Sequence, residues 1–354
     1  MKINKLSIWI VFLLAIAVVG SSCSKKKSTT EAKKASQFEV IATAADNYLA
    51  SGKAPVITSS NVYANLNDGN SANDPYVLSI RSATDFANGH VPGAHNIPWR
   101  EIAKTANLSK LPTDKQIVVV CYTGHTASQT TMFLNEMGYD AVAMKFGMTS
   151  WDTVAAHTHI YHSSDPSDCP DYPVETTPHV LAKGNSFPTV NHTTSTDPKE
   201  IIRTATDAYL GSGKAPVILS SALYTNLNDG NTSNDPLVLS VRGHADYLAG
   251  HIPGAVNIPY REVARDTNLA KLPTDKQIVV VCYTGHTASQ ITMLLNQLGY
   301  DAVALKYGMT SWTVDPSKNP SAATNRPYDP NRDCGNYPVA TGSGLLKIAN
   351  AVNW

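Results

Sequence analysis

The sequence has 354 residues, which exceeds one ordinary hydrophobic core and is enough for two domains. Its 28 basic and 28 acidic residues balance to a formal charge of zero, so we expect no nucleic-acid partner. An apolar share of 42% argues against general disorder.

The chain opens with a segment that resembles a bacterial lipoprotein signal. Met1–Lys5 is a short basic region, and Leu6–Val19 is apolar but too short for a comfortable membrane span. Small residues then precede Cys23. Gly20 stands at the third position before this cysteine, where lipoprotein signals usually have an aliphatic residue. We expect residues 1–23 to be a signal peptide ending at a lipidated Cys23; an ordinary secretory peptide or an uncleaved anchor are the alternatives. The mature protein would be lipid-anchored in a bacterial cell envelope and would face the periplasm.

The rest of the chain contains the same unit twice. An offset of 161 residues maps Asp46 onto Asp207 and Trp151 onto Trp312 with no gap between these points. Two copies of this size can each bury a core, so we predict a tandem duplication rather than a solenoid. The expected parts are a flexible tether (residues 24–37), repeat one (38–156), a linker (157–198), repeat two (199–315) and a C-terminal tail (316–354).

Short apolar strands alternate with helices in repeat one, and repeat two follows the same order. The expected elements are a helix over Ser36–Ala50, a short element within Ile57–Leu66, a strand over Tyr76–Ile80, a short helix over Ala83–Asn88, a segment over Asn96–Pro98, a strand over Ile117–Val120, a helix over Thr130–Gly138, a strand over Asp140–Lys145 and a last helix from Gly147. This alternation predicts an α/β fold with a parallel sheet.

A nine-residue string occurs letter for letter in both repeats, at residues 121–129 and 282–290. Its first residue, Cys121 or Cys282, follows an apolar β-branched run and precedes a helical pattern. The cysteine is therefore expected where a buried strand ends and a loop bends into a helix N-terminus. Unpaired amides and the helix dipole stabilise a thiolate there and can hold a sulfur-borne negative charge. We predict that Cys121 and Cys282 are the catalytic nucleophiles; a buried, inert thiol is the alternative.

The rest of each string is the predicted substrate-binding loop. Its residues are Tyr122, Thr123, Gly124, His125, Thr126 and Ala127 in repeat one, and Tyr283, Thr284, Gly285, His286, Thr287 and Ala288 in repeat two. Each glycine would permit a positive φ or a close backbone approach. Each histidine would offer partial positive charge at mildly acidic pH. Each second threonine would either donate to the substrate or cap the helix.

Three stretches together resemble rhodanese-like domains. They are Arg81, Asp85-Phe86 and Gly89–Ala94 before the cysteine, the cysteine loop itself, and Gly147–Trp151 after it; Arg242, Asp246-Tyr247, Gly250–Ala255 and Gly308–Trp312 repeat the pattern. The resemblance implies two tandem domains, each a parallel five-stranded sheet flanked by helices. It also implies a sulfurtransferase that moves sulfane sulfur from thiosulfate, polysulfide or a similar donor to a thiophilic acceptor through a cysteine persulfide. This chemistry requires no cofactor, and a protein acceptor is compatible with it.

Both repeats depart from the pattern of that family at two places. Thr126 and Thr287 stand where the commonest active loop has arginine, and Ser79 and Ser240 replace an acidic residue. A dianionic donor would lose its best bidentate partner, which leaves the donor open. Phosphatase or arsenate reductase chemistry is disfavoured for the same reason. The alternative function is a non-catalytic sulfur or chalcogen carrier, or a redox-sensing module, at the cell envelope.

Two further cysteines, Cys169 and Cys334, lie in matching segments after the repeats. A disulfide between them, a resolving thiol for each active loop and two inert cysteines are all open on spacing alone. His157, His159 and His162 form a cluster without a counterpart in repeat two, so no metal site is predicted.

Overall fold

The computed structural model describes residues 35–154, 171–181, 184–319 and 328–342. The expected signal peptide with Cys23, the His157–His162 cluster and Cys169 therefore lie outside the described residues. Within the described part of the chain, no helix is both long and apolar enough to cross a membrane.

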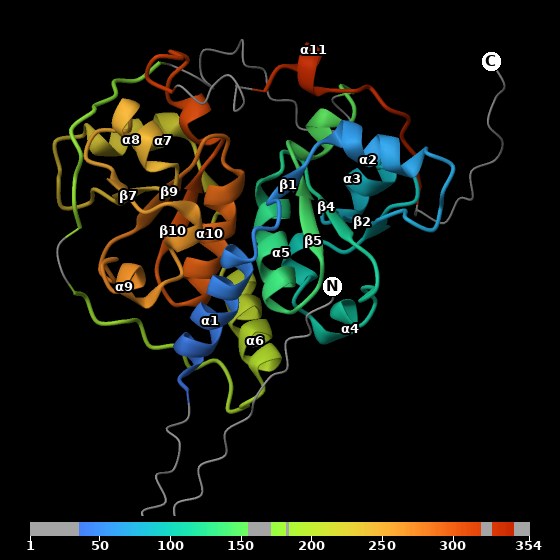
Figure 1. The fold of residues 1–354 in the computed structure, drawn as a ribbon, viewed down its shortest axis with the longest axis horizontal. Helices are drawn as coiled ribbons and strands as arrows, with labels where there is room; N and C mark the ends of the chain where they lie inside the picture. The colour runs from blue at the N-terminus through green and yellow to red at the C-terminus, as the bar shows by residue number, and fades with distance from the viewer. Residues whose placement is uncertain (1–34, 155–170, 182–183, 320–327, 343–354) are drawn as a thin grey trace, which may run out of the picture. The chain divides into compact units, whose positions relative to one another are not determined.

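Each repeat forms a five-stranded parallel sheet flanked by helices, as predicted (Figure 1). The strands are β1 (Val56–Ile57), β2 (Tyr76–Ser79), β3 (His95–Asn96), β4 (Ile117–Val120) and β5 (Ala141–Met144), then β6 (Val217–Ile218), β7 (Leu237–Ser240), β8 (Val256–Asn257), β9 (Ile278–Val281) and β10 (Ala302–Leu305). Their orders are β1-β5-β4-β2-β3 and β6-β10-β9-β7-β8. The central strands β4 and β9 are buried along their whole length, which suits their unbroken β-branched sequence.

Helices and 3-10 turns connect the strands. They are α1 (Gln37–Ala50), α2 (Ser59–Leu66), α3 (Ala83–Asn88), η1 (Trp99–Glu101), α4 (Thr105–Leu108), α5 (His125–Glu136), η2 (Gly147–Ser150), α6 (Pro198–Gly211), α7 (Ser220–Leu227), α8 (His244–Ala249), η3 (Tyr260–Glu262), α9 (Asp266–Leu269), α10 (His286–Gln297), η4 (Gly308–Ser311) and α11 (Pro330–Asp333). A capping box starts α1, because the Ser36 hydroxyl accepts from the Glu39 amide and the Glu39 carboxylate accepts from the Ser36 amide.

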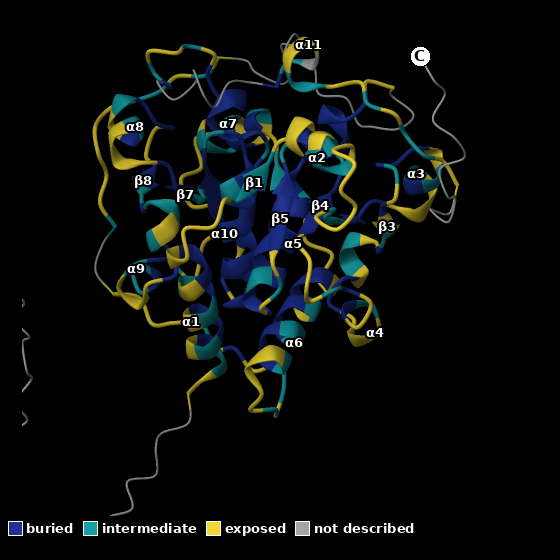
Figure 2. Ribbon diagram, turned by 45° about the vertical axis from the view of Figure 1, so that its right-hand side comes forward, coloured by how far each residue is buried: buried dark blue, intermediate teal, exposed yellow. Residues whose placement is uncertain are grey.

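Two of the expected elements of repeat one differ in the structure. The helix predicted from Thr130 begins at His125, because Gly124 adopts a left-handed φ of 88° and turns the chain directly into α5. The last helix, expected from Gly147, is only the 3-10 turn η2. Polar side chains of α5 are buried along with apolar ones, so its sequence lacks an amphipathic period. Figure 2 shows the burial of α5 and α10.

The two repeats contact each other mainly through α5 and α10, with α1 and α6 beside them. An arginine of each repeat also binds the end of the other repeat's first helix. Arg261 donates to the carbonyls of Leu49, at 2.6 Å, and Lys53, at 3.1 Å. Its counterpart Arg100 donates to the carbonyls of Leu210 and Lys214. Free carbonyls at a helix C-terminus attract cations, so these contacts anchor the start of each repeat against the other.

The segment after each repeat packs on the other repeat. We name residues 171–181 the first tail and residues 328–342 the second tail. The first tail binds repeat two, where the Trp312 indole donates to the Pro173 carbonyl at 2.8 Å. The second tail binds repeat one, where the Trp151 indole donates to the Pro338 carbonyl at 2.9 Å. The tails are therefore exchanged between the repeats.

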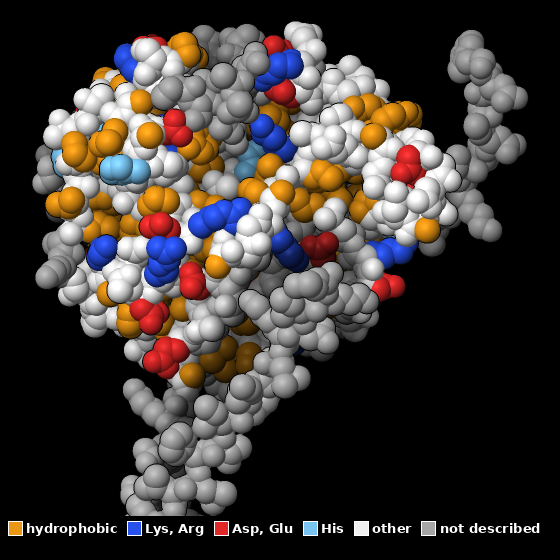
Figure 3. Space-filling view, viewed as in Figure 1, with side chains coloured by type: hydrophobic (Ala, Val, Ile, Leu, Met, Phe, Trp, Pro, Cys, Tyr) orange, Lys and Arg blue, Asp and Glu red, His pale blue; other side chains and the backbone are white. Residues whose placement is uncertain are grey.

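Charged side chains are interspersed over the face drawn in Figure 3. One surface ion pair occurs in both repeats, Lys53–Asp140 at 2.8 Å and Lys214–Asp301 at 2.7 Å. All four side chains are about half exposed, so each pair contributes at most about 1 kcal/mol. The fold therefore rests mainly on its buried core.

Candidate active site

Each predicted nucleophile lies at the carboxyl end of its central strand, just before a helix. Cys121 follows β4 and Cys282 follows β9, and both are 2% exposed. The amide of Gly124 donates to the Cys121 sulfur at 3.0 Å, and the amide of Gly285 donates to the Cys282 sulfur at 3.1 Å. An amide that points at sulfur stabilises negative charge on it.

The Gly147–Trp151 element holds the backbone of the first loop. The Met148 amide donates to the Cys121 carbonyl at 2.8 Å, and the Thr149 amide donates to the Tyr122 carbonyl at 3.1 Å. Gly147 has a φ of 55°, and a β-carbon there would lie 2.8 Å from the Tyr122 carbonyl carbon. The glycine is required by this close approach. The same bonds recur at Met309 and Thr310 in repeat two.

The histidine of each loop binds a backbone amide of the other repeat, and we call this pair of contacts the histidine exchange. The Nε2 atom of His286 accepts from the Phe146 amide at 3.0 Å, and Nε2 of His125 accepts from the Tyr307 amide at 2.9 Å. Each Nδ1 atom is 2.9 Å from the hydroxyl of the threonine two residues before it, Thr123 or Thr284. The two imidazole rings stack with centroids 5.8 Å apart. Each histidine thus joins its own loop to the other repeat.

This arrangement differs from the positive charge that the sequence suggested for the two histidines. Burial lowers the pKa of His125 to about 3, and the nearby charge of Lys306 contributes. Burial also lowers the pKa of His286 well below its usual value, with contributions from His125 and Lys145. Both imidazoles are therefore neutral at mildly acidic pH, as acceptors for a backbone amide must be.

A cavity of about 450 Å³ opens over Cys282. Within the predicted loop it is lined by Tyr283, Thr284, His286 and Thr287. Repeat one supplies Pro55, Val56 and Lys145 to the same cavity. Sequence reasoning missed this contribution from the other repeat. The one available signal was that Lys145 recurs as Lys306 at the same offset.

The remaining loop residues are buried or lie in the helix that follows the loop. Gly285 and Ala288 are buried, as are their counterparts Gly124 and Ala127 in repeat one. Thr126 and Thr287 lie within the first turns of α5 and α10 and are half-buried; the capping positions belong to the glycines.

The arginine that precedes each loop in the sequence packs against the loop's tyrosine and the segment before it. Arg81 is buried and donates to the carbonyls of Asp85, at 3.2 Å, and Gly89, at 2.5 Å. Its guanidinium also lies 5.7 Å from the ring centre of Tyr122, whose hydroxyl bonds the Asp85 carboxylate. Arg242, Tyr283 and Asp246 form the equivalent group in repeat two. Through these contacts the arginines hold the segments that support the loops.

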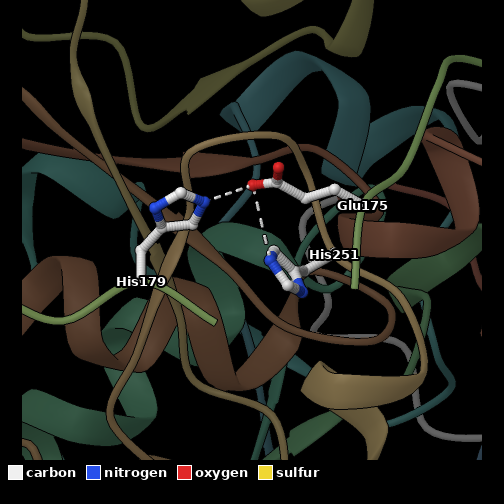
Figure 4. A group of neighbouring side chains, drawn as sticks. All are labelled: Glu175, His179 and His251. Atoms are coloured by element: carbon white, nitrogen blue, oxygen red, sulfur yellow. Dashed lines mark hydrogen bonds and ion pairs between the residues drawn. The ribbon is translucent and has the colours of Figure 1, made fainter. Parts of the chain in front are cut away.

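Three side chains of repeat two and the first tail could offer ligands to a metal ion (Figure 4). Atoms of Glu175, His179 and His251 lie within 4.8 Å of one another. The Glu175 carboxylate already accepts from His179 at 2.7 Å and from the Gly254 amide at 2.5 Å. Hydrogen bonding therefore explains the cluster as an attachment of the first tail. In repeat one, Ala340 takes the place of Glu175 opposite His90.

Glu175→Gln is expected to destabilise the protein by about 1 kcal/mol at pH 7 and by much less near pH 3. Burial by itself raises the pKa of Glu175. Hydrogen bonds from Gly254 and His179 outweigh this effect and lower the pKa. A carboxyl with a lowered pKa stabilises the fold at neutral pH, and this contribution is lost as pH falls through that pKa. Thermal unfolding of both proteins at the two pH values measures the difference. Equal destabilisation at both would contradict the carboxylate's role.

Comparison with known proteins identifies both repeats. The rhodanese-like domain family matches residues 58–153 and 220–315, which is more than half of the chain. The HTH-type transcriptional regulator Rv0324 of Mycobacterium tuberculosis is 38% identical over 79 residues, which cover 22% of this chain and 34% of that protein. Thiosulfate sulfurtransferase GlpE of Shewanella oneidensis is 32% identical over 76 residues, covering 21% and 73% of the two chains.

Among solved structures, a thiosulfate sulfurtransferase from Pseudomonas aeruginosa is 17% identical, with a TM-score of 0.27, and the match covers 76% of this chain and 46% of that one. The family matches cover the strand, cysteine and loop of each repeat described above. The chain belongs to the rhodanese-like domain family, and it contains the domain twice.

Proposed function

We propose that the protein is a sulfurtransferase in which Cys121 and Cys282 each carry sulfane sulfur as a persulfide. The observation that carries this proposal is the amide-to-sulfur bond in each loop, 3.0 Å at Cys121 and 3.1 Å at Cys282. A thiolate is the nucleophile in such chemistry, and the same amide can stabilise the charge of a persulfide. The cavity over Cys282 provides room for a small donor.

The proposed donor is thiosulfate, with polysulfide as the alternative. The name of the Shewanella oneidensis relative supports thiosulfate. The cysteine thiolate attacks the outer sulfur of thiosulfate, a new sulfur–sulfur bond forms, and sulfite leaves with the electron pair of the old bond. The persulfide then gives its terminal sulfur to a thiophilic acceptor, a small thiol or a protein, and the thiolate is restored. These steps use no cofactor.

Sulfur transfer from thiosulfate to cyanide tests the proposal in the wild type, Cys121→Ser, Cys282→Ser and the double variant. Since the loops are identical in sequence, each single variant is expected to keep roughly half of the turnover. The double variant is expected to lose it. Persulfide labelling without turnover would favour the carrier or sensor. A double variant as active as the wild type would refute the role of both cysteines.

We also propose that the mature protein is anchored to the bacterial cell envelope through a lipid on Cys23 and faces the periplasm. The apolar segment followed by small residues and Cys23 supports this proposal. Cys23→Ala is expected to abolish incorporation of a labelled fatty acid during expression of the full chain. Unchanged labelling would argue against acylation of Cys23.

A further inference from the structure

Among the described residues, one cation that lines the cavity over Cys282 has neither an ion-pair nor a hydrogen-bond partner. Its ionic side chains are Lys145, Arg261 and Glu262. Arg261 is occupied by the carbonyls of Leu49 and Lys53. Lys145 is half-buried, and among the described residues its ammonium makes neither an ion pair nor a hydrogen bond. A half-buried ammonium without such partners is suited to an anionic ligand.

Lys145 comes from repeat one, yet its position is tied to the loop of repeat two. It follows β5, and its amide donates to the Ile57 carbonyl at 2.8 Å. The next amide, that of Phe146, donates to His286 at 3.0 Å. The Lys145 ammonium lies 5.2 Å from the centre of the Phe146 ring. The histidine exchange thus holds the lysine beside the Cys282 loop.

The charged groups around Lys145 leave its ammonium free to bind an anion. Burial and the charge of Arg332 lower the pKa of Lys145, while Asp333 and Cys282 raise it. Asp333 is itself paired with Arg332 at 2.5 Å. His286 is neutral, as argued above. Cys282 thus has a lysine of the other repeat within its electrostatic reach.

The backbone, ring and histidine contacts of this lysine recur around the other loop. Lys306 occupies the position of Lys145 at the offset of 161 residues. Its amide donates to the Ile218 carbonyl at 2.9 Å, and its ammonium lies 5.2 Å from the Tyr307 ring centre. The Tyr307 amide donates to His125, and the charge of Lys306 acts on that histidine. Both loops therefore have a lysine supplied by the other repeat.

We propose that Lys145 completes the Cys282 site and Lys306 completes the Cys121 site, each binding the anionic half of a small dianionic sulfane donor. This inference rests on the sulfurtransferase function proposed above. The lysines would replace the arginine that both loops lack, where Thr126 and Thr287 stand. A cation there attracts the incoming dianion and stabilises the charge that builds up on the leaving sulfite. Each repeat would then need the other for its activity.

The chain offers its own control, because each lysine is assigned to a single cysteine. Lys145→Gln is introduced into Cys121→Ser, where only Cys282 acts, and into Cys282→Ser, where only Cys121 acts. Sulfite release from thiosulfate, with cyanide as the sulfur acceptor, is measured in both. We expect kcat/KM to fall about tenfold or more at Cys282 and less than about twofold at Cys121. Lys306→Gln should give the reverse, and Lys145→Arg should retain most of the rate.

A second readout does not depend on sulfur transfer. The rates at which anionic iodoacetate and neutral iodoacetamide alkylate each cysteine are compared in the same variants. Lys145→Gln is expected to lower the ratio of iodoacetate to iodoacetamide rates at Cys282 and to leave it unchanged at Cys121. Equal effects at both cysteines, or no effect on either readout, would overturn the assignment. A shifted alkylation ratio in a protein without turnover would retain the lysine site and refute the sulfurtransferase.

Discussion

Gly124→Ala is expected to lower the free energy of unfolding by about 4 kcal/mol, although it adds a single methyl group. Gly124 has a φ of 88°, which costs an alanine about 1–2 kcal/mol. The added carbon would also lie 2.8 Å from His286 Cδ2 and 2.9 Å from the Phe146 nitrogen. It would therefore disrupt the hydrogen bond from the Phe146 amide to His286, which joins the second loop to repeat one. Urea unfolding of both proteins measures the loss.

Gly138→Ala is the matched control for this substitution. Gly138 follows α5 and has a φ of 91°, but a β-carbon there would meet nothing within 4 Å. Gly138→Ala should lower the free energy of unfolding only by what the positive φ costs an alanine, about 1–2 kcal/mol. The difference between the variants measures the close approach of the loops. Equal losses at Gly124 and Gly138 would show that the histidine exchange contributes nothing.

The predicted fold and nucleophiles depended on local sequence. The β-branched run before Cys121, the glycine three residues later and the repeat of the whole string were enough to place the cysteine at a strand end before a helix. The five-stranded parallel sheets confirm the fold expected from the family resemblance. The strand, cysteine, loop and helix of each copy are determined within about thirty residues of chain. The pattern needs no knowledge of how the repeats pack.

The rest of the site depended on contacts between residues far apart in sequence. His125 was expected to offer partial positive charge in the binding loop, but its Nε2 accepts from the Tyr307 amide, 182 residues away. Lys145 carried no local signal, because a lysine after a strand is ordinarily a solvated surface residue. Its place beside Cys282 follows from the packing of α5 on α10. The sequence repeat marked both residues as recurrent without indicating that they cross to the other repeat.

A buried carboxyl marks the point where equivalent positions of the two repeats meet. Glu136 ends α5, and Gln297, which ends α10, is its counterpart at the offset of 161 residues. The Gln297 amide nitrogen donates to Glu136 Oε2 at 2.7 Å and to the Thr206 hydroxyl at 2.8 Å. Two acids here would repel each other, whereas an acid and an amide can pair. Burial raises the pKa of Glu136 to about 8.

Glu136→Gln is expected to stabilise the protein by about 3 kcal/mol at pH 7 and to have almost no effect at pH 4. The folded protein retains the Glu136 proton up to about pH 8, whereas the unfolded chain loses it near the usual value of 4.5. Stability therefore falls as pH rises through this window, by about 1.4 kcal/mol per unit. Glutamine has no proton to lose and removes this dependence. Urea unfolding from pH 4 to pH 8 measures it.

Gln297→Glu supplies the opposite test at the equivalent position. It would place a second carboxyl against Glu136 and remove the amide donor that now binds both Glu136 and Thr206. We expect its stability to fall more steeply between pH 4 and pH 7 than that of the wild type, because two buried acids must then stay protonated. If Glu136→Gln gave the same gain at pH 4 as at pH 7, better packing would be its cause. The carboxyl's charge would then have no part in the contact between the repeats.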